Sequence, residues 1–145
     1  MTPTPRIAAV DFGLRRVGLA VTDPLRLFAQ PLGTFTPDGA VERLRALRAA
    51  PEGLERVVVG WPLEEGGEEG AAVERVQPFV NRLRRALKGV EVAVQDERHS
   101  SRRAAEALVA AGVKKKDRRQ KGRLDAAAAA VILQDYLEEH GSPAR

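Results

Sequence analysis

The sequence predicts an α/β fold built around one mixed, five-stranded sheet. Three apolar segments of strand length lie within residues 7–35, close enough along the chain to pair as an antiparallel meander. Beyond residue 36, short apolar runs alternate with longer segments that have a helical period. Such alternation implies right-handed crossovers, which join parallel strands. The length of 145 residues, without an internal repeat or linker, predicts a single domain over residues 1–145.

The antiparallel part of the sheet comes first. Ile7–Val10 and Val17–Val21 are short apolar runs, and the polar turn between them contains Gly13, so we expect a hairpin. Leu27–Phe35 is expected to add a third strand. Pro31 should place this strand at an edge, because proline cannot donate to a ladder of hydrogen bonds.

The first predicted helix follows Asp38, which can cap it, and stops at Pro51. One face has apolar residues at spacings of three and four and ends in an arginine: Val41, Leu44, Leu47 and Arg48. Val57–Val59 is then a strand that is covered on both faces. A second amphipathic helix carries Val73, Val76, Val80, Leu83 and Leu87, and Pro78 should kink it or shift its start.

The last part of the chain is predicted to be strand, helix, basic loop, helix. Val90, Val92 and Val94 alternate with other residues and form the fifth strand. Ser100 or Ser101 can cap a helix that stops at Gly112, and a basic loop covers 113–122. The final helix runs from near Arg123 to about residue 139, and the tails 1–5 and 140–145 are expected to be loose.

Composition favours an anionic partner. The net charge is +4 and the isoelectric point about 10.0, and positive charge gathers in Arg102–Arg103 and in Lys114–Arg123. The lack of cysteine excludes disulfides, thiolate metal sites and cysteine nucleophiles. No apolar stretch approaches the roughly 20 residues of a membrane helix, and there is no signal-peptide pattern, so we expect a cytoplasmic protein without a membrane partner.

Three acidic residues stand where the fold would not ordinarily place them. Asp11 ends the first strand, Glu97 follows the last strand, and Asp125 heads the buried stripe of the last helix, formed by Ala128, Ala129, Ile132, Leu133 and Tyr136. Clustered carboxylates repel unless a cation lies among them, and their hard oxygen ligands suit one or two Mg²⁺ or Mn²⁺ ions. Two such metals could orient a water molecule and stabilise the leaving oxygen of a phosphodiester.

Each acidic residue also has an ordinary structural interpretation. Asp11 could cap a turn, Glu97 could pair with Arg98 or Arg102, and Asp125 could favour the N-terminus of its helix. The basic loop could be solvated surface. The joint occurrence of three acids at element ends favours the metal site over these separate explanations.

Four motifs resemble those of the YqgF (RuvX) family, in order and over nearly the whole chain. They are DFGLRRVGLA at 11–20, VGWPL at 59–63, DER at 96–98 with Ser100–Ser101, and LDAAA at 124–128 with ILQDYL at 132–137. The resemblance implies a ribonuclease H-like fold with helices on both faces of the sheet. It also implies a metal-dependent nuclease site at Asp11, Glu97 and Asp125. The acidic loop Glu64–Glu69 departs from the Asn, Asp, Gly and Ser that are common there in the family.

Family members are described as nucleases that mature the 5′ end of the 16S ribosomal RNA precursor, and earlier as Holliday junction resolvases. We therefore expect a nuclease of structured nucleic acid, either ribosomal RNA precursor or branched DNA. Basic residues are expected to bind it: Arg15, Arg16, Arg98, Arg102, Lys114, Lys115, Lys116, Arg118, Arg119 and Arg123. The sequence leaves the oligomeric state open, a homodimer included.

Two other functions compete with a nuclease. Asp-x-Gly at a strand turn also opens actin-like ATPases and sugar kinases, but these need a second domain and a second glycine-rich phosphate loop, which this sequence lacks. A non-catalytic nucleic-acid-binding or ribosome-associated module is the other alternative. The presence of all three acidic residues weighs against it.

Overall fold

The computed structural model describes residues 4–97 and 121–140, and only the backbone at 121–124. In chain order its elements are β1 (Arg6–Phe12), β2 (Val17–Thr22), β3 (Ala29–Phe35), α1 (Pro37–Ala49), β4 (Leu54–Trp61), α2 (Ala71–Ala86), β5 (Glu91–Asp96) and α5 (Lys121–His140). The helix expected after Ser100 or Ser101 and the basic loop 113–122 lie outside the described residues.

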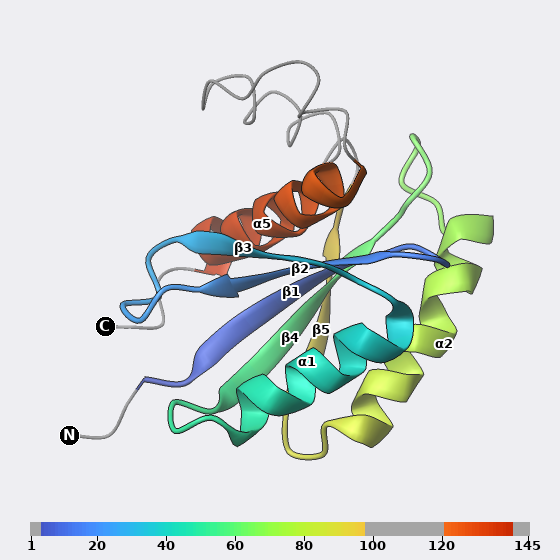
Figure 1. Cartoon of the computed structure of the whole chain (residues 1–145). Helices are drawn as coiled ribbons and strands as arrows, with labels where there is room; N and C mark the ends of the chain where they lie inside the picture. The colour runs from blue at the N-terminus through green and yellow to red at the C-terminus, as the bar shows by residue number, and fades with distance from the viewer. Residues whose placement is uncertain (1–3, 98–120, 141–145) are drawn as a thin grey trace.

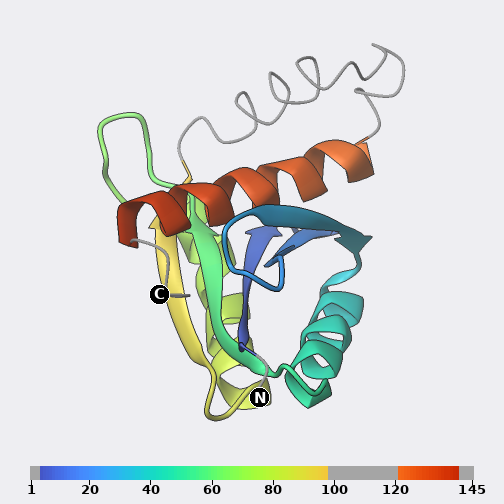
Figure 2. The same ribbon diagram turned by 90° about the vertical axis from the view of Figure 1, so that its left-hand side faces the viewer.

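The strands form one sheet in the order β3-β2-β1-β4-β5. β1 pairs with β2 and β2 pairs with β3 in antiparallel fashion, whereas β4 is parallel to both β1 and β5. The predicted mixed sheet is thereby confirmed, including the edge position of the strand that contains Pro31. Figures 1 and 2 show α1 and α2 on one face of this sheet and α5 on the other.

Side chains alternate along β1 between two hydrophobic cores. Ala8 and Val10 are buried against α1 and α2, and Ile7 and Ala9 are buried against α5. Successive residues of a strand point to opposite faces, so Asp11 continues the series of Ile7 and Ala9 on the face of α5. The alternation therefore turns the carboxylate of Asp11 toward the last helix.

The helix α5 packs by the predicted stripe, since Ala128, Ala129, Ile132, Leu133 and Tyr136 are all buried. At its end, the ring of His140 stacks on Tyr136 with 4.1 Å between centroids, and the hydroxyl of Tyr136 accepts a hydrogen bond from Arg56. His140 therefore belongs to the last turn of α5, although the sequence suggested a loose tail from this residue onward.

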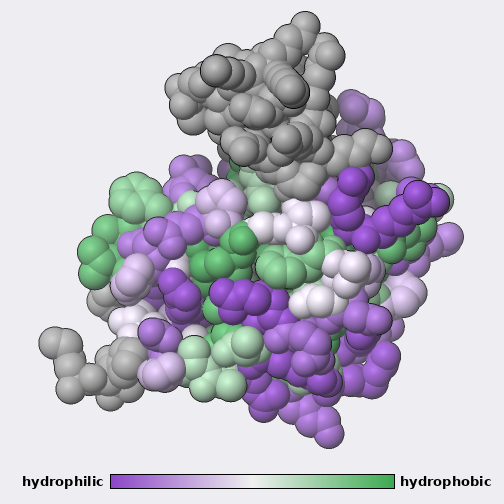
Figure 3. Space-filling view, viewed as in Figure 1, coloured by the Kyte–Doolittle hydropathy of each residue, from purple (hydrophilic) through white to green (hydrophobic). Residues whose placement is uncertain are grey.

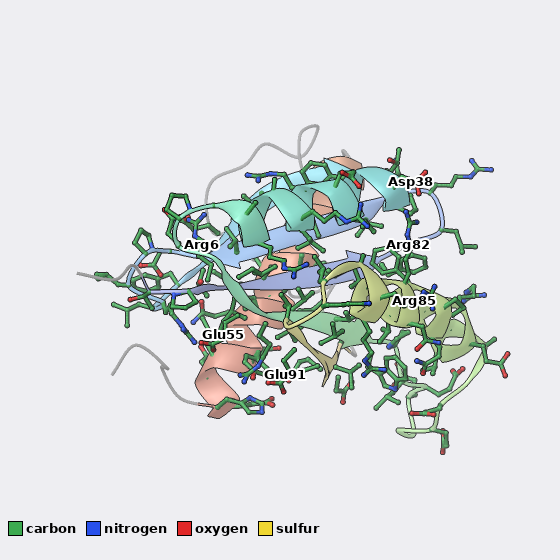
Figure 4. The ribbon with its side chains drawn as sticks, turned by 90° about the horizontal axis from the view of Figure 1, so that it is seen from below. Arg6, Asp38, Glu55, Arg82, Arg85 and Glu91 are labelled. Atoms are coloured by element: carbon green, nitrogen blue, oxygen red, sulfur yellow. The ribbon has the colours of Figure 1, made fainter. Side chains whose placement is uncertain are left out.

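The structure corrects two details of the first predicted helix. Thr36, not Asp38, caps α1: its hydroxyl accepts a hydrogen bond from the backbone N–H of Gly39 at 3.0 Å. Asp38 lies in the first turn and forms an ion pair of 2.7 Å with Arg82 of α2, as Figure 4 shows from below. Arg48 is exposed, whereas its neighbour Leu47 is buried. Arg48 therefore does not belong to the buried face of α1.

Three other expectations also need correction. The strand around Val57–Val59 is longer than expected, since β4 extends from Leu54 to Trp61 and includes Gly60. α2 begins at Ala71 and continues through Pro78, so the proline does not shift its start. On the edge strand β5, Val94 is 45% exposed, whereas Gln95 is buried and donates a hydrogen bond to Glu139 of α5 at 2.9 Å.

Hydrophobic side chains are exposed together at the turn between β2 and β3, where Leu25, Leu27 and Phe28 lie (Figure 3). Because β2 is antiparallel to β1, this turn lies at the amino-terminal end of β1, away from Asp11. Within the described residues, no helix is both long and apolar enough to cross a membrane.

Candidate functional site

The candidate site lies at the edge where the parallel strands β1, β4 and β5 end. Asp11 is the penultimate residue of β1, and Glu97 directly follows β5. The backbone N–H of Glu97 donates to the carbonyl of Trp61, the last residue of β4, at 3.2 Å. Asp125 lies in the second turn of α5, one turn later than the sequence suggested, because the helix already begins at Lys121.

A hydrogen bond joins the carboxyl groups of Asp11 and Glu97. The pKa of Asp11 is raised to about 6: burial is the main cause and the charge of Asp125 adds to it, while the hydrogen bond from Glu97 acts in the opposite direction. Burial, followed by the charge of Asp11, raises the pKa of Glu97 to about 9. Two carboxyl groups can share a hydrogen bond only when one is protonated, so the pair holds one proton at neutral pH.

The third acid is close to this pair but contacts a different group. Oδ2 of Asp125 lies 3.5 Å from Nε of Arg16 in an ion pair that water partly reaches, and its electrostatic effect reaches Asp11. Within residues 4–97 and 121–140, no three His, Cys, Asp or Glu side chains are grouped closely enough to hold a metal ion. The structure thus brings Asp11 and Glu97 into contact and leaves Asp125 paired with Arg16.

Two glycines make room for this arrangement. Gly18 lies opposite Asp11 on β2, and a Cβ atom at this position would collide with the backbone carbonyl of Asp125. A Cβ atom at Gly60 would collide with the carboxylate of Glu97 and with Ile132 of α5. The absence of these two side chains therefore allows the start of α5 to approach β2 and allows Glu97 to lie over β4.

A pocket of about 490 Å³ opens beside the acids. Its walls come from the end of β1, the turn after it, α2 and α5, and consist of Asp11, Phe12, Gly13, Leu14, Arg15, Arg16, Arg75 and Asp125. A smaller pocket of about 110 Å³ contains Glu97 and shares four of these residues: Phe12, Gly13, Leu14 and Arg75. Carboxylates and guanidinium groups face the same volume, which is the arrangement expected of a site for a cation and a phosphate together.

From its place in the sequence, between Gly60 and Pro62, Trp61 is a candidate for stacking on a nucleic-acid base. Its indole instead packs against the core on the side of α1 and α2, and its Nε1 donates to Glu69 at 2.9 Å. This bond attaches the acidic loop Glu64–Glu69 to the end of β4.

The structure brings together five of the residues that the sequence singled out: Asp11, Glu97, Asp125, Arg15 and Arg16. Arg123 lies in the first turn of α5, where the backbone alone is described. The other basic residues lie outside the described part of the chain: Arg98, Arg102, Lys114, Lys115, Lys116, Arg118 and Arg119.

Arg75 of α2 lines both pockets, and the sequence interpretation overlooked it. Arg75 lies one helical turn before Phe79, and Phe79 packs against Phe12, the residue after Asp11. This relation places Arg75 near the acids. The sequence alone could not place Arg75 at the site, because the contact between Phe12 and Phe79 is known only from the structure.

The chain is similar to known proteins along nearly its whole length. A family model described as "RuvX: Holliday junction resolvase" matches residues 5–139. A protein of Salinibacter ruber, named as a candidate pre-16S rRNA nuclease, is 54% identical over 94% of this chain and 94% of its own. A protein of Chlorobaculum tepidum with the same name is 48% identical, over 93% and 94% of the two chains.

Among solved structures, T. thermophilus RuvC in complex with a Holliday junction substrate superposes with a TM-score of 0.58. The superposition covers 95% of this chain and 98% of RuvC at 20% identity. At this identity the match identifies the fold, which is ribonuclease H-like, as expected.

Proposed function

The chain belongs to the RuvX family, and we propose that it is a metal-dependent endonuclease that cleaves phosphodiester bonds in the precursor of 16S ribosomal RNA. The observation that carries the proposal is the hydrogen-bonded pair of Asp11 and Glu97, with Asp125 nearby, beside a pocket lined by arginines. The names of the relatives supply the substrate. We propose that the protein acts in the cytoplasm.

The acids fit a divalent metal by their chemistry. Asp11 and Glu97 retain a proton between them at neutral pH because burial and mutual repulsion disfavour two negative charges there, and a bound cation would replace that proton. Mg²⁺ or Mn²⁺ would accept these hard oxygen ligands: Asp11 and Glu97 would hold one or two ions, and Asp125 would join them on leaving Arg16, since the three side chains are not grouped closely enough for one ion in this structure. When bound, such a metal lowers the pKa of a coordinated water molecule and neutralises charge on a phosphate.

The protein's own basic residues have a separate role. Arg15 is exposed beside the pocket, and Arg16 lies across from Asp125, so both can contact the phosphates of a strand that enters it. The ion pair between Arg16 and Asp125 is partly exposed, and pairs of this kind contribute little stability. An incoming phosphate can therefore compete for Arg16 at small cost.

Two observations favour a second substrate, branched DNA. The family model carries the description of a Holliday junction resolvase, and the fold is that of RuvC. A cleavage assay that compares a ribosomal RNA precursor with a four-way DNA junction, each with Mg²⁺ or Mn²⁺, decides between the two. Cleavage of the RNA supports the proposal, and cleavage of the junction alone replaces it with the resolvase.

The acids themselves supply the test of mechanism. We expect Asp11→Asn, Glu97→Gln and Asp125→Asn each to abolish metal-dependent cleavage, because each keeps the size of the side chain and removes one negative ligand. Glu42→Gln is the matched control: Glu42 is an exposed acid of α1 that pairs with Arg45 and lines neither pocket of the site, and this variant should cleave at the wild-type rate. Wild-type cleavage by Asp11→Asn would refute the site, and a wild type that cleaves neither substrate would favour the non-catalytic binding module.

A further inference from the structure

Arg75 occupies an unusual position between the two pockets of the site. It lies on α2, which packs on the face of the sheet opposite to α5 (Figure 1). It nevertheless shares the larger pocket with Asp11 and Asp125 and the smaller one with Glu97. It therefore lines the space beside the end of β1 from the side of α2, together with Gly13 and Leu14 of the turn after β1.

The packing of α2 explains this position. Phe79 follows Arg75 by one helical turn, so the two side chains lie on the same face of the helix. The ring of Phe79 lies 4.7 Å from that of Phe12, which directly follows Asp11 on β1. This buried aromatic contact holds the start of α2 beside the end of β1, so that Arg75 stands on a rigid element next to Gly13 and Leu14.

The charge of Arg75 is available to a ligand. Of the three arginines that line the larger pocket, Arg16 is paired with Asp125. Arg75 is exposed and forms no ion pair with the described residues, whereas Arg82 on the same helix is paired with Asp38. A guanidinium that lines the same pockets as the acids, and that forms no ion pair with the described residues, is suited to bind an anion there.

We propose that Arg75 is a phosphate-binding residue that holds a phosphodiester of the substrate strand in the pocket beside Asp11 and Asp125. This inference rests on the proposed function and adds a contact that the sequence did not suggest. The pocket of about 490 Å³ lies within the range of small-ligand sites, so a nucleotide unit can enter it. The planar guanidinium offers two parallel N–H groups to two oxygens of a phosphate, which a lysine ammonium cannot match.

The test measures binding without cleavage. Affinity for a short single-stranded RNA oligonucleotide is determined in EDTA over a series of salt concentrations, with wild type, Arg75→Ala and Arg75→Lys. Arg85→Ala is the matched control, since it removes the same charge from the same helix at an exposed residue that lines neither pocket of the site (Figure 4). Thermal melting checks that all variants are folded.

We expect Arg75→Ala to weaken binding by about 10-fold to 100-fold, the effect of removing one charge-assisted hydrogen-bonded interaction. The slope of log K against log salt should flatten by about 0.7, because the variant neutralises one phosphate fewer on a single strand. Arg75→Lys should restore the slope but only part of the affinity, because the charge remains and the planar fork does not. Arg85→Ala should bind like wild type.

Equal affinity and equal salt slope for Arg75→Ala and Arg85→Ala would overturn the inference, and so would a wild type that does not bind the oligonucleotide. Cleavage by the wild type with Mn²⁺ is measured in parallel. If binding depends on Arg75 but the wild type does not cleave, the endonuclease is refuted and the phosphate contact stands.

Discussion

At the scale of single residues, the shared proton of Asp11 and Glu97 makes the protein sensitive to pH. The pKa of each group in the folded chain, about 6 and about 9, lies above its ordinary value of 3.8 or 4.5. Protonation therefore favours the folded state. The stability that these two groups contribute is complete below about pH 4 and is lost as the pH rises through about 6 and then about 9.

The pH dependence of unfolding follows from this sign. We expect the free energy of unfolding of metal-free protein, measured with urea, to fall between about pH 4 and pH 9. Glu97→Gln should make this fall smaller, because the amide keeps a donor for Asp11 and does not titrate. Glu42→Gln should follow the wild type, and an identical curve for Glu97→Gln would contradict the shared proton.

A second prediction at this scale concerns Gly18. The methyl group of Gly18→Ala would meet backbone atoms of Asp125 and Ala126, so α5 must move away from the sheet. We expect a loss of about 1–3 kcal/mol in stability, as for overpacked cores, together with loss of cleavage because Asp125 is displaced.

Gly53→Ala provides the comparison for Gly18→Ala. Its Cβ meets no atom within 4 Å, but its φ of 76° is unfavourable for alanine. This variant should lose stability and still cleave. Full cleavage by Gly18→Ala would show that the close approach of α5 at this glycine is not needed by the site.

At the scale of elements, the basic segment from Lys114 to Arg123 is predicted from the sequence to bind phosphates of the substrate. If this segment contacts phosphates, the triple change of Lys114, Lys115 and Lys116 to alanine should weaken binding to many sequences alike. The slope of log K against log salt should flatten by about 0.7–0.9 for each phosphate that is no longer neutralised. An unchanged affinity and slope would identify the segment as solvated surface.

At the scale of the whole molecule, the acids come from β1, from the end of β5 and from α5, so a bound metal would connect three separate elements. A ligand that binds only the native state raises its stability by RT ln(1 + [L]/Kd). We therefore expect Mn²⁺ to raise the melting temperature of the wild type, and to raise that of Asp11→Asn or Asp125→Asn less. An equal Mn²⁺ response in wild type and Asp11→Asn would argue against a metal at this site.

Much of the fold could be predicted from local patterns. The strands Arg6–Phe12 and Val17–Thr22 follow from apolar runs with a polar turn between them, and the buried stripe of α5 follows from its spacing. The sequence prediction was wrong where two nearby residues could both take the same structural role. The sequence offers both Thr36 and Asp38 as caps for α1, and the structure uses Thr36 because the helix already begins at Pro37, which places Asp38 in its first turn.

The candidate acids also follow from the sequence, because charged residues at the ends of apolar elements are unusual enough to be noticed. Their relations do not follow from it. That Glu97 bonds to Asp11 while Asp125 pairs with Arg16 depends on distances between β1, β5 and α5, which no local pattern contains. Arg75 was overlooked for the same reason, since one arginine of an amphipathic helix resembles any other until its neighbours are known.

The sequence by itself determined the strands and helices of the described residues, the buried face of α5, and which acids lie near the end of β1 and follow β5, because these properties depend on residues within one turn or one strand. The tertiary structure alone decided that Gly18 and Gly60 admit Asp125 and Glu97 to the site, and that α2 places Arg75 beside them. The physical reason is that side-chain packing between elements far apart in the chain sets these approaches, and packing is a property of the folded molecule.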